Sequence, residues 1–382
     1  MDFDWSPEQL ELRDSVETFA SHQLQDDLLR RDHEHTFSRE LWDRCAAFGI
    51  QGLPFPPEYG GSGYDPLTTV LALEALGYGC KDAGLVFGIG AQMWSVQMPI
   101  ARHGTDEQRG RYLGRLCGGE WIGAHGMSEP DSGSDAFSLR TRAVRDGDDY
   151  VLTGTKTFVS EAPVADLFLV FATIDPALGP RGITAFLVER AMDGVDVSGP
   201  IGKMGLRTSP MAELILDGCR VPGGNRLGRE GRGGLIFNDS MEWERSCLLA
   251  GAVGTLRRQL ESAVRYAGQR EQFGRRIGEF QAISHRLADM RVRLETSRLL
   301  LYRAAWLKQC GHREAGPMSA LAKLHISEAC VNSALDAVRI RGGYGYTTEY
   351  EVERELRDSV GGTLYSGTSD IQRALLARAM GF

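Results

Sequence analysis

The stretch Met127-Ser128-Glu129-Pro130-Asp131-Ser132-Gly133-Ser134-Asp135 lies just inside a boundary at which the periodicity of the 382-residue chain changes. On its N-terminal side, apolar residues recur at helical spacing. Ser6-Pro7-Glu8-Gln9 has the pattern of a capping box with proline at the first helical position. Further helical patterns cover residues 38–48, 66–78, 84–102 and 105–117. The sequence therefore predicts a helical domain over residues 1–120.

Beyond the boundary, the chain consists of short runs that are rich in β-branched and aromatic residues. Turn signals such as Asp146-Gly147 and Asp217-Gly218 separate these runs. The runs include residues 150–152, 167–171, 183–188 and 212–216. This pattern predicts a small antiparallel β domain over residues 121–230.

Helical periodicity returns from residue 231 to the end of the chain. The segments lie near residues 234–270, 279–311, 316–340 and 370–380. Helices of this length exceed the usual globular length, which indicates that they pack together as a bundle. We therefore expect an α+β multi-domain protein in which an N-terminal α-helical domain and a middle antiparallel β domain precede a C-terminal four-helix-bundle domain over residues 231–382.

The composition excludes several classes of function. The 43 basic and 51 acidic residues give a formal net charge of −8, which argues against sequence-independent binding to nucleic acid or to an anionic membrane. The start of the chain, MDFDWSPEQLELRDSV, has no basic segment followed by an apolar one, and no later apolar run is long enough to span a membrane. We expect a cytoplasmic protein whose partners are small molecules or proteins.

Motifs for metals and for the common nucleotide sites are missing. The seven cysteines form no CxxC pair, and neither an HExxH motif nor a His/Cys cluster occurs, so no disulfide framework or metal site is expected. Gly154-Thr155-Lys156-Thr157 lacks the spacing of a phosphate-binding loop, and no βαβ alternation predicts a doubly wound sheet. Any cofactor must be held by a different arrangement.

Three stretches together resemble the acyl-CoA dehydrogenase family of flavoproteins. The first is the stretch quoted above, followed by Gly154-Thr155-Lys156-Thr157-Phe158-Val159-Ser160. The second is Arg270-Glu271-Gln272-Phe273-Gly274 with Phe280-Gln281, and the third is Gly342-Gly343-Tyr344-Gly345-Tyr346 with Leu364-Tyr365-Ser366-Gly367-Thr368-Ser369-Asp370-Ile371-Gln372. The resemblance covers essentially the whole chain. It implies a fold of α, β and α domains and a FAD-dependent dehydrogenase that acts on acyl thioesters.

The resemblance also implies which residues bind FAD. The first stretch and the strand after it would line the isoalloxazine ring, because flavin chemistry belongs to the cofactor and the protein supplies orientation and hydrogen bonds. Ser128 and Ser160 replace more usual threonines there, and Phe158 replaces a common tryptophan. The full implied set is His125, Met127, Ser128, Ser134, Phe158, Val159, Ser160, Arg270, Phe273, Phe280, Gln281, Arg339, Gly342, Gly343, Thr368 and Asp370.

Two members of this set imply an assembly. Arg270 and Phe273 match residues that reach the FAD of a neighbouring subunit in the family, and a planar guanidinium suits a pyrophosphate. The resemblance therefore implies a homo-oligomer, dimer or tetramer, with FAD sites shared between subunits. Arg339 stands where the family usually has glutamine, and its effect on the phosphates is left open.

The C-terminal stretch raises the question of the catalytic base. Ser369-x-x-Gln372 fits a capping box at the start of the last helix. In many members of the family, the position of Ser366 holds the glutamate that removes the substrate α-proton, which a serine cannot do at neutral pH. If the chain is an enzyme, a carboxylate must come from elsewhere.

Glu244 is the candidate for that carboxylate. On a helix it shares a face with Cys247, Leu248 and Gly251, so it lies on an apolar stripe, where poor solvation raises the pKa of a carboxyl group toward neutral pH. Branches of the family that act on branched or long acyl groups place their base on this helix, immediately before an arginine that Arg245 matches. From the residues alone, a buried structural carboxylate paired with Arg245 or Arg275 remains an alternative.

The resemblance implies a reaction in which Glu244 takes the α-proton while a hydride leaves the β-carbon for flavin N5. A flavin ribityl hydroxyl and the backbone N–H of Ser366 would stabilise charge on the thioester oxygen. The implied substrate-binding residues are Arg245, Tyr365, Ser366 and Ser134.

The surroundings of Glu244 and Ser366 look like those of the branch that oxidises an L-prolyl group on a peptidyl carrier protein to pyrrole-2-carboxyl. Such carriers are acidic as a rule, so a local basic patch near the pocket mouth is expected, and Arg339 and Arg341 are candidates by charge alone. Two alternatives stay open. One is a short or branched-chain acyl-CoA dehydrogenase that passes electrons to an electron-transfer flavoprotein, and the other is a non-catalytic FAD-bound scaffold.

Overall fold

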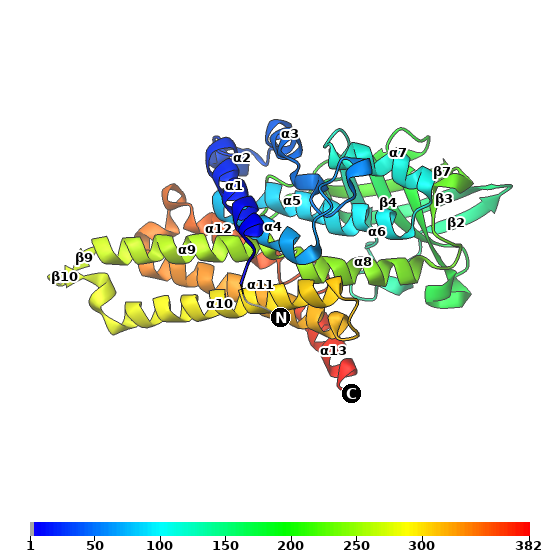
Figure 1. The fold of residues 1–382 in the computed structure, drawn as a ribbon. Coiled ribbons are helices and arrows are strands. Elements are labelled where there is room, and N and C mark those ends of the chain that lie inside the picture. Colours follow the sequence, from blue (N-terminus) through cyan, green and yellow to red (C-terminus); the bar gives the residue numbers. More distant parts are fainter. Residues whose placement is uncertain (1–3) are drawn as a thin grey trace.

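The computed structural model describes residues 4–382, so the first three residues of the acidic start lie outside the described part (Figure 1). The N-terminal region is helical, as predicted. Ser6 accepts a hydrogen bond from Gln9 N, and the Gln9 side chain accepts one from Ser6 N, which confirms the capping box. The helices are α1 (Pro7–Gln23), α2 (Leu28–Glu34), α3 (Arg39–Phe48), α4 (Pro66–Gly79), α5 (Ala83–Gln92), α6 (Met98–His103) and α7 (Asp106–Cys117).

The helix predicted over residues 84–102 is interrupted. A π-helical turn, η3 (Met93–Gln97), separates α5 from α6. Such turns occur mostly as single wide turns inside α-helices and are frequent at functional sites. The apolar periodicity did not reveal it, because all five residues of η3 are buried.

The middle region is one mainly antiparallel sheet with the strand order β6-β7-β3-β2-β4-β5-β8. The predicted antiparallel β domain is confirmed, with two parallel exceptions, since β1 and β2 each pair with β4 in parallel. The strands are β1 (Gly123–Gly126), β2 (Arg142–Asp146), β3 (Asp149–Ser160), β4 (Leu167–Thr173), β5 (Ile183–Glu189), β6 (Val195–Val197), β7 (Met211–Val221) and β8 (Arg226–Leu227).

The two predicted turns in this sheet have different outcomes. Asp146-Gly147 joins β2 to β3, as expected. Asp217-Gly218 is no turn between strands, because both residues lie inside β7. There Gly218 has φ +63°, opposite a register shift between Leu152 and Gly154, so the glycine permits a β-bulge instead.

The C-terminal region is the helical bundle. It contains α8 (Gly233–Cys247), α9 (Ala250–Gln269), α10 (Gln281–Gln309), α11 (Ala315–Arg341), α12 (Val352–Gly361) and α13 (Ser369–Ala379), with a short hairpin of β9 (Glu271–Gln272) and β10 (Arg275–Arg276). The single helix predicted over residues 234–270 is in fact two, α8 and α9. Helix α12 was not predicted, because its buried face includes the charged residues Arg354 and Asp358.

The capping box predicted at Ser369 is wrong. Thr368 is the N-cap of α13, and its hydroxyl accepts a hydrogen bond from Ile371 N at 3.3 Å. Ser369 is the first helical residue, and the Gln372 amide points back to the preceding loop. The error is one residue, within the usual uncertainty of a helix end.

The bundle and the β domain lie at opposite ends of the molecule, and α8 extends from the bundle toward the sheet (Figure 1). The β9–β10 hairpin forms the far tip of the bundle. Helices α4 and α9 can approach closely because residue 77 is a glycine. A Cβ at that position would come within 2.0 Å of Gly251 O. Within residues 4–382, none of the helices is both long and apolar enough to cross a membrane.

Candidate active site

The Glu244 carboxylate lies between two segments that are distant in sequence. Ser95, on the π-helical turn η3, donates a hydrogen bond from Oγ to Glu244 Oε2 at 2.5 Å. Ser366, in the loop before α13, donates one to Glu244 Oε1. Arg245 donates its Nε hydrogen bond to Ser366 O rather than to the carboxylate, and Arg275 lies over the ring of Phe280. The alternative in which Glu244 forms a structural ion pair with Arg275 is therefore wrong.

Burial determines the ionisation of Glu244. It raises the pKa of this carboxyl above the ordinary value, although the hydroxyls of Ser366 and Ser95 favour the charged form. The buried indole rings of Trp94 and Trp243, next in sequence to Ser95 and Glu244, stack with 5.9 Å between centroids and an angle of 3° between planes. A carboxyl group in this setting takes up a proton more readily than an exposed one does.

The loop that carries Ser366 is held in an uncommon backbone conformation. Ser366 has φ +57° and Gly367 has φ +86°. The Ser366 carbonyl accepts hydrogen bonds from Arg245 Nε at 3.0 Å and Gln372 Nε2 at 3.0 Å. The Gly367 carbonyl accepts from Gln372 Nε2 at 2.8 Å and from Lys323 Nζ at 2.7 Å. Because both carbonyls are fixed, the Ser366 hydroxyl is held against Glu244 despite the strain expected for a non-glycine residue at this φ.

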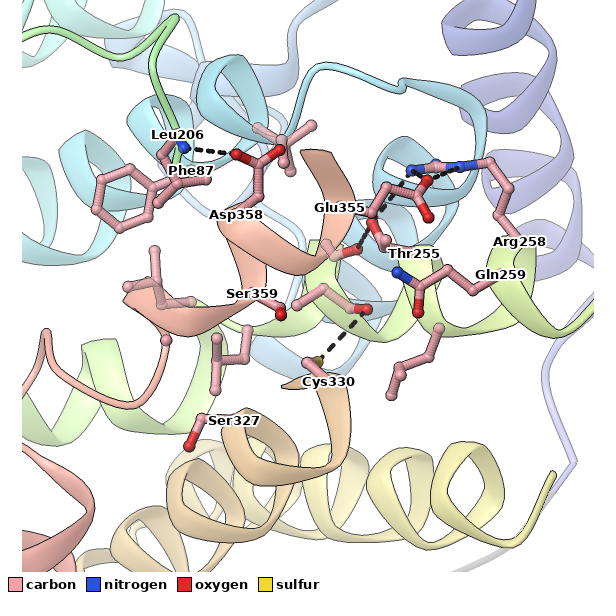
Figure 2. A pocket seen from close by; sticks show the side chains of 18 of the residues that line it. Phe87, Leu206, Thr255, Arg258, Gln259, Ser327, Cys330, Glu355, Asp358 and Ser359 are labelled. Carbon is pink, nitrogen blue, oxygen red and sulfur yellow. Dashed lines mark hydrogen bonds and ion pairs between the residues drawn. The ribbon is translucent and has the colours of Figure 1, made fainter. Parts of the chain in front are cut away.

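A cavity of about 70 Å³ has Tyr365 among its lining residues. Phe87, Ser327 and Asp358 also line it (Figure 2). The ring of Tyr365 packs against Phe87 with 4.8 Å between centroids. Leu248, one helical turn after Glu244, lines the apolar part of the cavity. Within this lining, Asp358 Oδ1 accepts a hydrogen bond from Leu206 N at 2.6 Å, and burial raises the pKa of Asp358 to about 7.

The residues predicted to line the flavin ring lie together on the β domain. Ser128 O accepts a hydrogen bond from Thr157 N at 2.9 Å, which places the first stretch beside the strand that carries Phe158 and Ser160. Phe158 has φ +55° and a side chain that is 64% exposed. His125 Nε2 is buried and has no hydrogen-bond partner among the described residues. The exposed ring of Phe158 offers an open aromatic face to a flat ring, and the unpartnered His125 Nε2 is a polar atom of the same domain.

A buried ion pair fixes this surface. Lys156 Nζ donates to Glu129 Oε1 at 2.7 Å and to Met127 O at 3.2 Å. The Glu129 carboxylate also accepts from the backbone N–H groups of Arg140 and Thr141. Burial opposes ionisation of Glu129, but Lys156 and these N–H groups together lower the pKa of its carboxyl. The pair thereby ties the first stretch to β3.

A second group of predicted cofactor residues lies at the opposite end of the molecule, around the β9–β10 hairpin. Phe273, at the tip, has φ +53° and is 93% exposed. The Arg270 guanidinium lies 5.5 Å from the ring centre of Tyr344 in η8 (Gly342–Tyr346). Gly342 and Gly343 are exposed here, Phe280 caps α10 before Gln281, and Arg339 lies 3.6 Å from Asp336. One chain therefore does not bring the two groups together.

The remaining predicted residues are simple to place. Ser134 is exposed in the loop after β1, and the side chains of Val159 and Met127 are buried in the core, so only their backbone atoms are available to a ligand. Asp370 is exposed in the first turn of α13, 3.3 Å from Arg373. Arg341 is buried and donates to Ser262 Oγ, so it belongs to no surface patch, contrary to expectation.

Sequence reasoning missed three residues of the site. Ser95 lies on the π-helical turn, which no periodicity indicated. Lys323 lies on a helix, α11, whose apolar pattern indicates only packing, although burial lowers the pKa of this lysine to about 8. Gln372 was assigned to a helix cap. A buried lysine is rare without a partner, and that is the one signal that could have drawn attention to Lys323.

The chain matches three protein-family models in order. They are the N-terminal domain of acyl-CoA dehydrogenase over residues 6–120, its middle domain over residues 124–219 and its C-terminal domain over residues 231–381. Together they cover most of the chain.

Individual proteins are also similar over their full lengths. An L-prolyl-[peptidyl-carrier protein] dehydrogenase of Pseudomonas fluorescens is 42% identical over 382 residues, with 100% of each chain covered. The crystal structure of the prolyl acyl carrier protein oxidase AnaB has a TM-score of 0.98 and 48% identity, with 99% of this chain and 100% of that chain covered. The structure of PigA with FAD and proline has a TM-score of 0.97 and 39% identity, with coverage of 100% and 99%.

Proposed function

The chain belongs to the acyl-CoA dehydrogenase family of flavin oxidoreductases, and from this premise we propose that it dehydrogenates an L-prolyl group carried as a thioester on a peptidyl carrier protein. The observation that carries the proposal is the Glu244 carboxylate. It is buried, is held by the hydroxyls of Ser95 and Ser366, and forms no ion pair with any cation among residues 4–382. Such a group binds a proton readily and is fixed in position.

The cofactor is FAD. When bound, it supplies the acceptor for the hydride that leaves the substrate. The exposed ring of Phe158 and the polar atoms of Ser128, Ser160 and His125 fit its ring system on the β domain. Thr368 and Asp370, at the start of α13, are further residues that would contact the FAD. At the other end of the molecule, the residues around the β9–β10 hairpin include Arg270, whose guanidinium would bind the diphosphate of FAD.

The distance between these two groups in Figure 1 supports a shared site. Because the two groups lie at opposite ends of one chain, the β9–β10 hairpin of one subunit would approach the FAD that is bound to the β domain of another subunit. The assembly is then a homo-oligomer, dimer or tetramer. Phe280, Gln281, Arg339, Gly342 and Gly343 would take part in the same contact.

The chemical step rests on Glu244 and the Ser366 loop. Glu244 takes the α-proton of the thioester, and its raised pKa matches that task. Among residues 4–382, the backbone N–H of Ser366 has no hydrogen-bond acceptor, so it is free to donate to the thioester oxygen as charge develops there. Arg245 orients the loop through the Ser366 carbonyl, and Tyr365 forms a wall of the pocket. Ser134, which is exposed in the first stretch, is the remaining residue that we propose to contact the substrate.

Conversion of the prolyl ring to pyrrole-2-carboxyl requires loss of four electrons and four hydrogens in two rounds. Glu244 must release its proton after the first round before it can act again. We propose that the acyl group extends from Glu244 toward the cavity lined by Leu248 and Tyr365, whose volume of about 70 Å³ would limit the length of that group. A small ring fits this limit better than a long acyl chain does.

Anaerobic mixing of the FAD-loaded protein with L-prolyl-carrier protein tests the proposal. We expect bleaching of the visible flavin band, and after turnover with an electron acceptor a product lighter by four hydrogens. Bleaching by a short or branched acyl-CoA but not by prolyl-carrier would replace the proposal with ordinary acyl-CoA dehydrogenation, with electrons passed to an electron-transfer flavoprotein. Stable FAD with no bleaching by any thioester would indicate a non-catalytic scaffold.

A further inference from the structure

An exposed surface of mixed apolar and basic character lies at the N-terminal end of α8. We call it the α8 entry surface, and it consists of Leu178, Arg181, Arg229, Arg232 and Leu235. Leu178 is 45% exposed and Leu235 is 57% exposed, and all three arginines are exposed. Exposed leucines ringed by charged side chains mark interaction sites more often than bare surface.

Backbone packing joins the two segments of this surface. A Cβ on Gly231 would come within 2.6 Å of Arg181 O, and one on Gly234 within 2.9 Å of Pro180 O. Gly231 N donates to Thr184 Oγ1 at 3.0 Å. The turn η5 (Pro176–Gly182) therefore lies directly against the segment that leads into α8, and the glycines make this close approach possible.

The positive charge of the α8 entry surface is not neutralised. No carboxylate among the described residues pairs with the side chains of Arg181, Arg229 or Arg232, whereas most other arginines of the chain are paired, for example Arg220 with Asp146 and Asp149. The acidic neighbour in the same segment, Glu230, instead accepts a hydrogen bond from the Tyr150 hydroxyl at 2.5 Å, so it is directed away. A chain of net charge −8 thus exposes a local cluster of three free guanidinium groups.

Helix α8 connects this surface to the proposed base. From Gly233 to Glu244 the helix rises about 16 Å. Phe237 and Ser240 stand seven and four residues before Glu244, on the same side of the helix. Ser240 Oγ is buried and lacks a hydrogen-bond partner in the described part of the chain, so a polar group is available between the surface and the base.

We propose that the α8 entry surface docks the carrier protein, with its arginines on carboxylates of an acidic carrier helix and its two leucines on apolar side chains of the same helix. This inference rests on the proposed function, because it names the partner of that reaction. The thioester arm of the docked carrier extends along α8 toward Glu244. Opposite charges at the rim of an interface mainly speed association and fix orientation.

The test compares Arg229→Glu/Arg232→Glu with Arg142→Glu/Arg145→Glu, a control that changes the net charge equally at exposed positions on β2. A negatively charged glutamate near the start of α8 interacts favourably with the helix dipole, so the first variant should fold. Flavin reduction is measured with L-prolyl-carrier protein, with L-prolyl-pantetheine, which has no protein, and with L-prolyl-CoA. Each is measured at low and high salt.

We expect kcat/KM for the carrier substrate to fall on the order of tenfold at low salt in the first variant only, with a weaker dependence on salt and an unchanged rate for L-prolyl-pantetheine. Unchanged kcat/KM for the carrier would overturn the docking site. An equal fall with L-prolyl-CoA would assign the arginines to CoA phosphates and also overturn it. If none of the three substrates reduces the flavin of the unmodified protein, the proposed function fails first, which is a distinct result.

Discussion

Glu129 and Glu244 are both buried carboxylates, but their surroundings give them opposite properties. Glu129 lies against the Lys156 ammonium and accepts two backbone hydrogen bonds, and its pKa is lowered. Within the described part of the chain, Glu244 accepts hydrogen bonds from two serine hydroxyls and from no cation, and its pKa is raised. The difference lies in the contacts. Burial acts on both groups, but at Glu129 the Lys156 ammonium at 2.7 Å and the backbone N–H groups together outweigh it, whereas at Glu244 the two serine hydroxyls do not.

This difference in pKa indicates a structural role for Glu129 and a role in proton transfer for Glu244. A carboxylate that stays charged is useful for fixing one strand to another, as Glu129 does between the first stretch and β3. A carboxylate that is kept without a contacting cation costs stability when it ionises, so a fold retains it where proton uptake is needed. The comparison therefore predicts that changes at Glu244 affect activity and that changes at Glu129 affect stability.

Glu244→Gln should give the largest effect on activity. Loss of a general base typically costs a factor of about 10²–10⁴, and the amide keeps the shape of the side chain. Anaerobic flavin reduction by L-prolyl-carrier protein measures it, with FAD content and thermal stability as controls. Flavin reduction in the variant at the rate of the unmodified protein would show that Glu244 is not the base, and the predicted difference between Glu244 and Glu129 would then be wrong.

Glu129→Gln should instead destabilise the fold. Removing one partner of a buried ion pair leaves Lys156 as an uncompensated charge in the core, at a cost of about 3–5 kcal/mol. Denaturant unfolding measures the loss. The matched control is Glu129→Gln/Lys156→Met, which should recover much of the stability because no buried charge remains. Equal destabilisation of both variants would show that the charge of Lys156 is not the cause.

Ser95→Ala should produce a smaller, specific effect on the base. Hydrogen bonds to charged groups are worth about 1.5–3 kcal/mol, so kcat/KM should fall roughly tenfold to a hundredfold. Since the hydroxyl stabilises the charged form, its loss raises the pKa of Glu244 and moves the acid limb of the pH–rate profile to higher pH. Ser95→Thr should restore both.

Ser297→Ala is the control for that change. Ser297 is buried on α10, and its hydroxyl has no partner within residues 4–382. Its replacement should leave the pH–rate profile in place. A shifted profile in the control would mean that removal of any buried hydroxyl perturbs the site.

The sequence predicted the parts of this comparison that depend on local spacing. The apolar stripe that contains Glu244 follows from residues three to seven positions away on one helix, and the cap at Ser6 follows from its next three residues. Ser95 is 149 residues from Glu244 and reaches it from a π-helical turn, and Lys156 is 27 residues from Glu129. Contacts of that range depend on tertiary packing, which no local pattern encodes. The three domains were predictable because the apolar pattern changes from a helical period to short strand-like runs and back to a helical period along the chain.

The smallest predicted effect is the pH dependence of stability, and its sign differs between the two carboxylates. The pKa of Glu244 lies above its ordinary value of 4.5 in the folded protein, so ionisation costs stability as pH rises from 4.5 through the folded pKa. Glu244→Gln should therefore gain in Tm over the unmodified protein as pH rises through that window. The pKa of Glu129 lies below 4.5, so its contribution is present above 4.5 and is lost as pH falls through the folded pKa. The deficit in Tm of Glu129→Gln should accordingly shrink on acidification. Differential scanning calorimetry of both variants between about pH 3 and pH 8 measures these trends, and trends of the same sign would mean that burial alone, rather than the contacting cation, controls both carboxylates.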